Sequence, residues 1–214
     1  MKTIKLAVVL VLVASLFTMC KKDSKKDPTT NTPTTEYYVK GTLNHQGWNW
    51  SVPADGSGYV VGSQGALGND QGTITGGIRP LISANNSSFQ PQLGVEFKTI
   101  AKPIDSDAAT VLSNFLTTGS WSYASNLNYT VGTKSVVVYY TDSSGKQYSS
   151  IGAQGGSILT IQSVTAVPGS VYNIDPGFKV KLIFSCVLYP VDGTGGALPA
   201  ENVETTMFVD QTLL

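Results

Sequence analysis

Few residues in this 214-residue sequence could act as nucleophiles, general bases or metal ligands. The chain has one histidine, His45, and two cysteines, Cys20 and Cys186. A Cys–His or Ser–His nucleophile would need His45 as its base, but His45 lies in "NHQG", a stretch typical of a hairpin turn. No Gly-x-Ser-x-Gly segment supplies a nucleophilic serine, and a structural zinc site needs more His or Cys ligands. The sequence therefore predicts no covalent catalysis, no metal and no other cofactor.

Paired carboxylates are the other chemistry that the sequence could support. Asp105 and Asp107 occur in "DSD", and glycosidases use two carboxyl groups on either side of the bond that they cleave. The same two residues also precede a stretch with helical spacing, where negative charge at a helix N-terminus is favourable. Helix capping therefore explains the pair without chemistry. A glycosidase-like enzyme is the third interpretation, and we expect the protein to be non-catalytic.

The best candidate for ligand binding is an aromatic and amide-rich segment, "GSWSYASNLNY", at residues 119–129. An exposed ring can stack on the face of a sugar while neighbouring amides bind its hydroxyl groups. We therefore expect Trp121, Tyr123 and Asn126 to contact a glycan or another polar ligand. The alternative is that Trp121 folds back as a lid on the core.

The N-terminus has the layout of a secretory signal peptide, because Lys2 and Lys5 precede twelve uncharged, mostly apolar residues at 6–17. A membrane-spanning helix needs about 20 apolar residues. The stretch "LFTMCKK" resembles the lipobox of bacterial lipoproteins, although Met19 stands where Gly, Ala or Ser is usual. The resemblance implies that a signal peptide, residues 1–19, is removed and that Cys20 is acylated as the mature N-terminus.

Residues 20–36 are predicted to be a membrane anchor followed by a tether. Four lysines follow Cys20 and favour anionic lipid head groups, and "PTTNTPTTE" contains no apolar residue, which predicts an extended, solvated chain. Charged residues directly after the cysteine also resemble the surface-export signals of Bacteroidota lipoproteins. We expect an exported protein that acylated Cys20 holds in the lipid bilayer of the outer membrane, on its periplasmic or its cell-surface face.

The remaining residues, 37–214, are predicted to form one domain of 178 residues. This part contains eight basic and eleven acidic residues, a net charge of −3, and Arg79 is its one arginine. Nucleic-acid binding needs a basic patch that this composition does not supply. We expect no nucleic-acid partner; the expected partners are the lipid bilayer, through acylated Cys20, and either a glycan or an envelope protein.

Short apolar runs bounded by Gly, Ser, Asn and Asp predict about nine or ten strands. In residues 92–100, Leu93, Val95 and Phe97 share one face, while Glu96 and Lys98 share the other, as in a sheet with one solvated face. Residues 105–119 have helical spacing and predict one short helix. The predicted fold is an all-β antiparallel β-sandwich, and a closed β-barrel is the alternative.

Two further patterns identify residues of the predicted core. Cys186 alternates with apolar residues in "KVKLIFSCVLY" and is expected to be a small buried hydrophobic residue rather than a reactive thiol. Trp48, Trp50 and Val52 alternate along one strand and are also expected to face the core.

Four stretches, "GTLNHQGWNWSV", "YYTDSSGKQYSS", "QGGSILTIQSV" and "VKLIFSCVLYP", together resemble small Bacteroidota β-sandwich lipoproteins of unassigned function. The resemblance implies fold and localisation, and it carries no catalytic residue. The preferred interpretation is a cell-envelope lipoprotein whose β-sandwich binds an extracellular glycan or another polar ligand. The alternative is a structural or adhesive surface lipoprotein without a small-molecule site.

Overall fold

The computed structural model describes residues 37–53, 58–70, 72–126, 134–168 and 176–214. The chain divides into two units, Met1–Thr34 and Thr35–Leu214, and all the described residues belong to the second. The elements are β1 (Tyr37–Leu43), β2 (Gln46–Val52), β3 (Tyr59–Asp70), β4 (Thr73–Ala84), β5 (Gln92–Pro103), α2 (Ala108–Phe115), β6 (Gly119–Tyr123), β7 (Ser135–Thr141), β8 (Gln147–Ser149), β9 (Ile158–Val167), β10 (Gly177–Pro190), β11 (Leu198–Asp210) and the 3₁₀ helix η2 (Gln211–Leu213). Strands predominate, so the all-β prediction is confirmed.

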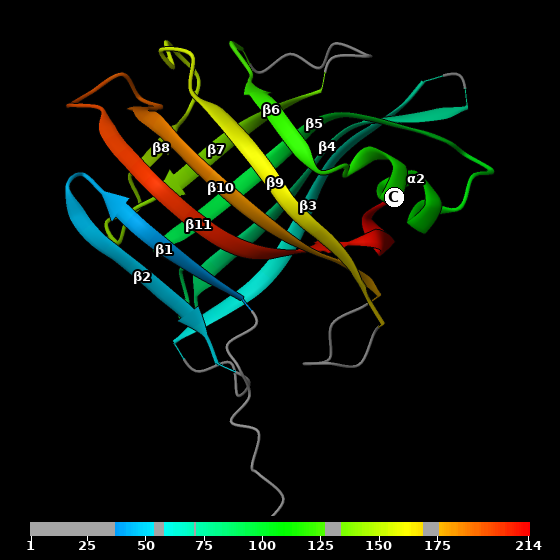
Figure 1. Cartoon of the computed structure of the whole chain (residues 1–214), viewed down its shortest axis with the longest axis horizontal. Helices are drawn as coiled ribbons and strands as arrows, with labels where there is room; N and C mark the ends of the chain where they lie inside the picture. Colours follow the sequence, from blue (N-terminus) through cyan, green and yellow to red (C-terminus); the bar gives the residue numbers. More distant parts are fainter. Residues whose placement is uncertain (1–36, 54–57, 71, 127–133, 169–175) are drawn as a thin grey trace, which may run out of the picture. The chain divides into compact units, whose positions relative to one another are not determined.

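The strands form a β-sandwich with two layers. The hydrogen-bonded order is β2-β1-β11-β10-β9-β6-β7-β5-β4-β3, and β8 pairs with both β7 and β10. Figure 1 shows β2, β1, β11, β10 and β9 in front of β7, β5, β4 and β3. Every described pairing is antiparallel except the short one between β6 and β7. The path has two ends, at β2 and β3, as expected of a sandwich rather than of a closed barrel.

Both predicted hairpins are present. Asn44 and His45 have positive φ angles of 50° and 62° and join β1 to β2, the backbone that a two-residue hairpin turn requires. In the β7–β8 turn, Asp142 Oδ1 accepts hydrogen bonds from the backbone N–H groups of Ser144 at 2.8 Å and Lys146 at 3.0 Å. The turn residues thus fix the register of each hairpin.

The predicted helix is shorter than the pattern suggested, with eight residues at Ala108–Phe115. Its N-terminal cap is Asp107, whose carboxylate accepts the backbone N–H of Thr110 at 2.7 Å. That hydrogen bond lowers the pKa of Asp107. The capping interpretation of the "DSD" segment is therefore confirmed for Asp107, and Gly119 begins β6 instead of ending the helix.

The core lies between the layers and is formed by alternate residues of the strands. In β10 the expected face of Val180, Leu182, Phe184, Cys186 and Leu188 is buried along its whole length. Burial raises the pKa of the Cys186 thiol to about 12, so the thiol stays protonated near neutral pH. The prediction that Cys186 is a buried hydrophobic residue is confirmed.

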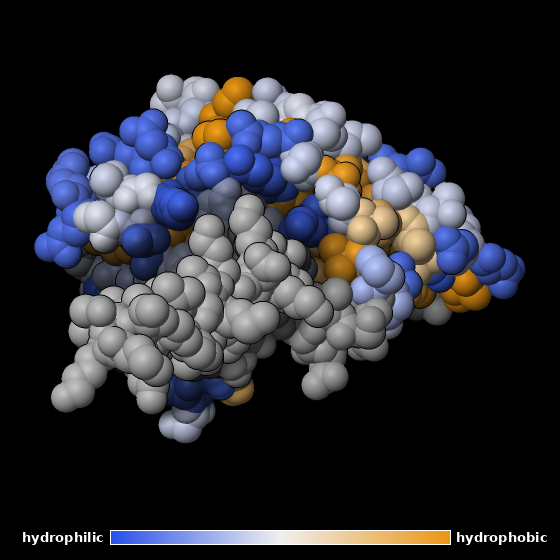
Figure 2. All heavy atoms as spheres, turned by 60° about the horizontal axis from the view of Figure 1, so that its bottom comes forward, coloured by the Kyte–Doolittle hydropathy of each residue, from blue (hydrophilic) through white to orange (hydrophobic). Residues whose placement is uncertain are grey.

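The surface of the described residues is mostly polar. Figure 2 shows hydrophilic residues over much of the visible face, with small hydrophobic patches between them. The large apolar side chains that stand exposed are Phe89, Ile104, Ile158 and Val191. Of these, Val191 lies beside the hollows that are described below.

Candidate ligand-binding site

The aromatic segment that the sequence indicated as a ligand site contributes instead to the core. Residues 119–123 form strand β6, and Trp121 is only 3% exposed. Its ring packs edge-on against Phe97 at 5.3 Å and Phe115 at 5.4 Å between ring centroids. The prediction that Trp121 presents an exposed ring to a ligand is therefore wrong, and the alternative of a core tryptophan holds.

Tyr123 shares the inward face of β6 with Trp121. Its hydroxyl donates a hydrogen bond to the backbone carbonyl of Ser185 at 3.0 Å, and burial raises its pKa. Asn126 is exposed, and its backbone carbonyl accepts a hydrogen bond from Lys98 Nζ at 3.1 Å. Because the two rings face the interior, the three predicted residues do not form one surface site. The alternation of Ser120, Trp121, Ser122 and Tyr123 was the sequence signal for this strand.

A different set of residues, including two from β8, forms a pocket of about 430 Å³. We call it the Arg79 pocket. Figure 1 shows β8 on the opposite side of the sandwich from α2. Its lining residues come from β4, β5, β7, β8 and the residue after β10: Arg79, Gln92, Glu96, Tyr139, Tyr140, Thr141, Gln147, Tyr148 and Val191. Three rings, two amides, a hydroxyl and an ion pair therefore line one hollow.

The ion pair lies on the face of β5 that the sequence predicted to be solvated. Arg79 Nη2 donates to Glu96 Oε2 at 2.9 Å, and Glu96 is only 3% exposed. Lys98 follows on the same face and is 1% exposed. Burial lowers the pKa of Lys98, and the charge of Glu96 opposes that shift. The predicted core face of β5 is confirmed, but the prediction that its other face is solvated is wrong, because Glu96 and Lys98 are buried there.

Gly94 and Tyr139 position the Arg79 side chain. A Cβ atom at Gly94 would lie 2.9 Å from Arg79 Cδ, so the arginine stem crosses β5 where that strand has no side chain. The Arg79 guanidinium lies over the Tyr139 ring, 3.9 Å from its centroid, as in a cation–π contact. Gly94 therefore leaves room for the side chain of Arg79, the one arginine of the chain. Sequence analysis did not connect these two residues.

A cluster of aromatic rings adjoins the Arg79 pocket. Tyr140 packs against Tyr148 at 6.0 Å and against Trp48 at 5.6 Å between centroids. Trp50 of β2 stacks on Tyr59 of β3 at 4.8 Å. Burial raises the pKa of Tyr140 to about 12, and the charge of Asp142 and the neighbouring tyrosines add to the shift. The expected core positions of Trp48 and Val52 are confirmed, while Trp50 is half-buried.

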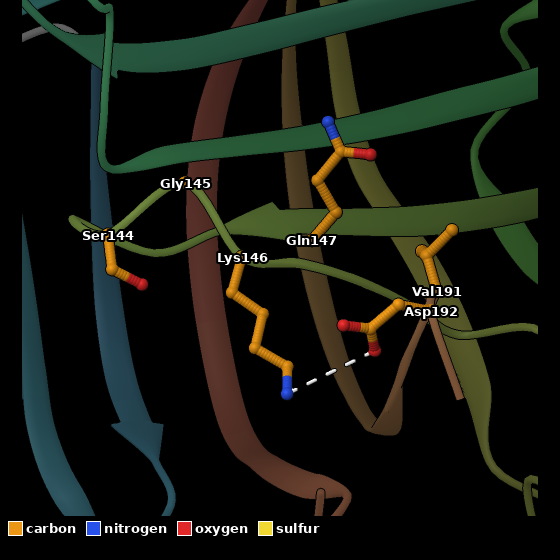
Figure 3. Close-up of a pocket in the computed structure, with 6 residues that line it drawn as sticks. All are labelled: Ser144, Gly145, Lys146, Gln147, Val191 and Asp192. Carbon is orange, nitrogen blue, oxygen red and sulfur yellow. Dashed lines mark ion pairs between the residues drawn. The ribbon is translucent and has the colours of Figure 1, made fainter. Parts of the chain in front are cut away.

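A second hollow of about 490 Å³ shares Gln147 and Val191 with the Arg79 pocket. Figure 3 shows Lys146 and Asp192 turned toward one another across this hollow, with Ser144 on the other side of the turn. Lys146 Nζ lies 4.0 Å from Asp192 Oδ1 and donates to the carbonyl of Thr194 at 2.5 Å. The two hollows therefore adjoin one another at Gln147 and Val191.

Each of the two hollows has one carboxylate among its described lining residues, Glu96 in the Arg79 pocket and Asp192 in the second hollow. Glu96 is the one carboxylate that lines the Arg79 pocket in the described part of the chain, and its charge is engaged by Arg79. Glycoside hydrolysis requires two carboxyl groups that face the scissile bond. Within the described ranges, no three His, Cys, Asp or Glu side chains are grouped as a metal site requires.

Comparisons with protein-family models, with curated proteins and with solved structures each found no match to this chain. In the described ranges, no helix has both the length and the apolar character of a membrane-crossing segment.

Proposed function

We propose that this protein is a lipid-anchored protein of the cell envelope whose β-sandwich binds a glycan or another polar ligand in the Arg79 pocket. The supporting observation is the composition of the pocket, in which Tyr140 and Tyr148 line the same hollow as Gln92, Gln147 and Arg79. A volume of about 430 Å³ lies within the range of small-molecule sites. Rings supply apolar contact with a sugar face, and amides and hydroxyls orient its polar groups.

Screening the full chain against an array of immobilised glycans tests the binding function. We expect at least one glycan to be retained, and we expect Gln147→Ala combined with Thr141→Ala to reduce its retention at least fivefold. Both side chains line the pocket without lying in the core. The matched control is Gln162→Ala, an exposed amide of β9. No retained glycan, or equal loss with the control, would contradict the proposal.

The anchor is proposed from the sequence, because the apolar run, Cys20 and the lysine-rich tether form the pattern of a bacterial lipoprotein. Mass spectrometry of the mature protein should show residues 1–19 removed and acyl chains on Cys20. Cys20→Ala should move the protein out of the membrane fraction. Cys186→Ala is the matched control, and it should leave the protein in that fraction.

A structural or adhesive role is the second candidate. The feature that favours it is the open path of the sheet, which ends at β2 and β3 and leaves strand edges that could pair with another chain. Self-association that persists when the Arg79 pocket is mutated, together with no glycan binding, would favour this role.

A further inference from the structure

The Arg79 guanidinium uses little of its hydrogen-bonding capacity. A guanidinium has five N–H donors, and the one hydrogen bond that this side chain makes to the described residues runs from Nη2 to Glu96. Its Nε atom is buried and has no partner among them. Arg79 and Glu96 also line a small hollow of about 90 Å³ with Gln64, Gly65 and Gly77, so the guanidinium borders two hollows.

Two basic side chains lie close to Glu96 in the part of the chain that the structure describes. Glu96 pairs with Arg79 and also attracts Lys98, so one buried carboxylate faces two cations. In the adjoining hollow, Lys146 is matched by Asp192 and adds no net charge. Asp142 lies near Tyr140 but directs its carboxylate into the hairpin turn, where it accepts backbone N–H groups.

The position of Arg79 is fixed before any ligand binds. The Tyr139 ring supports one face of the guanidinium, and the absence of a side chain at Gly94 sets the path of the arginine stem. A side chain that is already ordered loses less conformational entropy when it binds a ligand. The side chain still keeps 29% of its surface exposed, so part of it is accessible from solvent.

We propose that the ligand is an acidic saccharide and that Arg79 binds its carboxylate group. This inference rests on the proposed function and specifies the substrate class of the same pocket. A planar carboxylate matches the fork of a guanidinium and gives short, charge-assisted hydrogen bonds. The sugar ring then contacts Tyr140 and Tyr148, and its hydroxyls reach Gln92 and Gln147, which line the same pocket. A neutral sugar would offer the remaining guanidinium donors no charged acceptor besides Glu96.

Binding of the full chain, purified in detergent, to matched acidic and neutral polymers tests this inference. The probes are polygalacturonate, alginate and hyaluronate, the carboxyl-reduced form of each, and dextran sulfate. We expect at least one carboxylated polymer to bind at least tenfold tighter than its reduced form at 150 mM salt. Arg79→Gln should weaken that binding at least tenfold, whereas Lys40→Gln, which removes an exposed cation of β1, should change it less than twofold.

Arg79→Lys separates binding from folding, because it keeps the cation beside Glu96 but loses the guanidinium fork. We expect its thermal midpoint to stay near that of the parent and its affinity to fall several-fold. Equal binding of acidic and reduced polymers, or binding of dextran sulfate alone, would overturn the carboxylate assignment but leave a glycan-binding pocket. If no glycan binds the folded chain, both this inference and the proposed function fail.

Discussion

The two sides of the sandwich each contain a tryptophan-centred aromatic group, and the two groups differ in how far they are closed. On the α2 side, Trp121 is enclosed by Phe97 and Phe115 and is 3% exposed. On the β8 side, Trp50 stacks on Tyr59 and both stay half-buried next to the Arg79 pocket. The covered group contributes to stability, and the open group leaves ring surface that a ligand can contact.

The two sides also differ in whether their buried side-chain donors make hydrogen bonds. The indole N–H of Trp121 donates to the carbonyl of Thr117 at 3.3 Å, and the Tyr123 hydroxyl donates to Ser185. On the other side, Trp48 Nε1 and Arg79 Nε are buried without a partner among the described residues. An unpaired buried donor costs about 1–3 kcal/mol. The β8 side therefore retains two buried donors without a partner among the described residues, whereas Trp121 and Tyr123 on the α2 side each donate a hydrogen bond.

The largest expected effect comes from truncating the two tryptophans. Trp121→Ala should lower the free energy of unfolding by about 3–5 kcal/mol, because it leaves a cavity in a closed core. Trp50→Ala should lower it by about 2 kcal/mol, because less of this ring is removed from water. Urea denaturation followed by circular dichroism measures both changes. Equal losses would mean that the two groups are equally closed, and the comparison would fail.

Removing one tyrosine hydroxyl from the α2 side should lower the free energy of unfolding by less than either tryptophan truncation. Tyr123→Phe leaves the Ser185 carbonyl without its donor, next to the irregularity in the β10–β11 register. We expect a loss of about 1 kcal/mol in unfolding free energy. Tyr140→Phe serves as the matched change on the open side and should be nearly neutral at pH 7. A larger loss for Tyr140→Phe would contradict the assignment of Tyr123 to the closed core.

The sequence predicts the fold better than the site because strand patterns are local and pockets are not. Alternation identified the buried faces of β5 and β10, and turn residues placed the β1–β2 and β7–β8 hairpins. Asp107 was identifiable as a helix cap from its position before an amphipathic stretch. Each of these inferences depends on residues within one short segment.

The Arg79 pocket could not be predicted because it joins five distant segments of the chain. Nothing local to Arg79 indicates that it crosses Gly94 to reach Glu96, since that contact depends on the β4–β5 register. Trp121 was misplaced for the related reason that its neighbours in sequence are polar. Its apolar neighbours, Phe97 and Phe115, belong to β5 and α2.

Alkaline pH should weaken the fold through buried tyrosines of both groups. The pKa of Tyr140 is about 12 in the folded chain, and an unfolded tyrosine has a pKa of about 10. Since the unfolded chain releases the proton first, the contribution of Tyr140 to stability is complete below pH 10 and is lost as pH rises toward 12. Tyr140→Phe should therefore make the decline in urea midpoint between pH 10 and 11 shallower. The pKa of Tyr123 is also raised by burial, so Tyr123→Phe should act in the same direction, and an unchanged slope in both variants would contradict the burial of these hydroxyls.

The smallest expected difference is one of tryptophan fluorescence. Replacing tryptophan by phenylalanine keeps an aromatic ring at each position, so it disturbs the fold less than replacement by alanine. Three variants that each keep a single tryptophan report the exposure of Trp48, Trp50 and Trp121 separately. Acrylamide should quench Trp50 several-fold more strongly than Trp121, and Trp48, at 5% exposed, should resemble Trp121. In concentrated urea the three quenching constants should converge, which shows that the difference comes from the fold.

If the acidic polymer that binds the chain also shields Trp50 but not Trp121, the ligand lies on the β8 side. Shielding of Trp121 alone would place the ligand on the closed side and reverse the comparison.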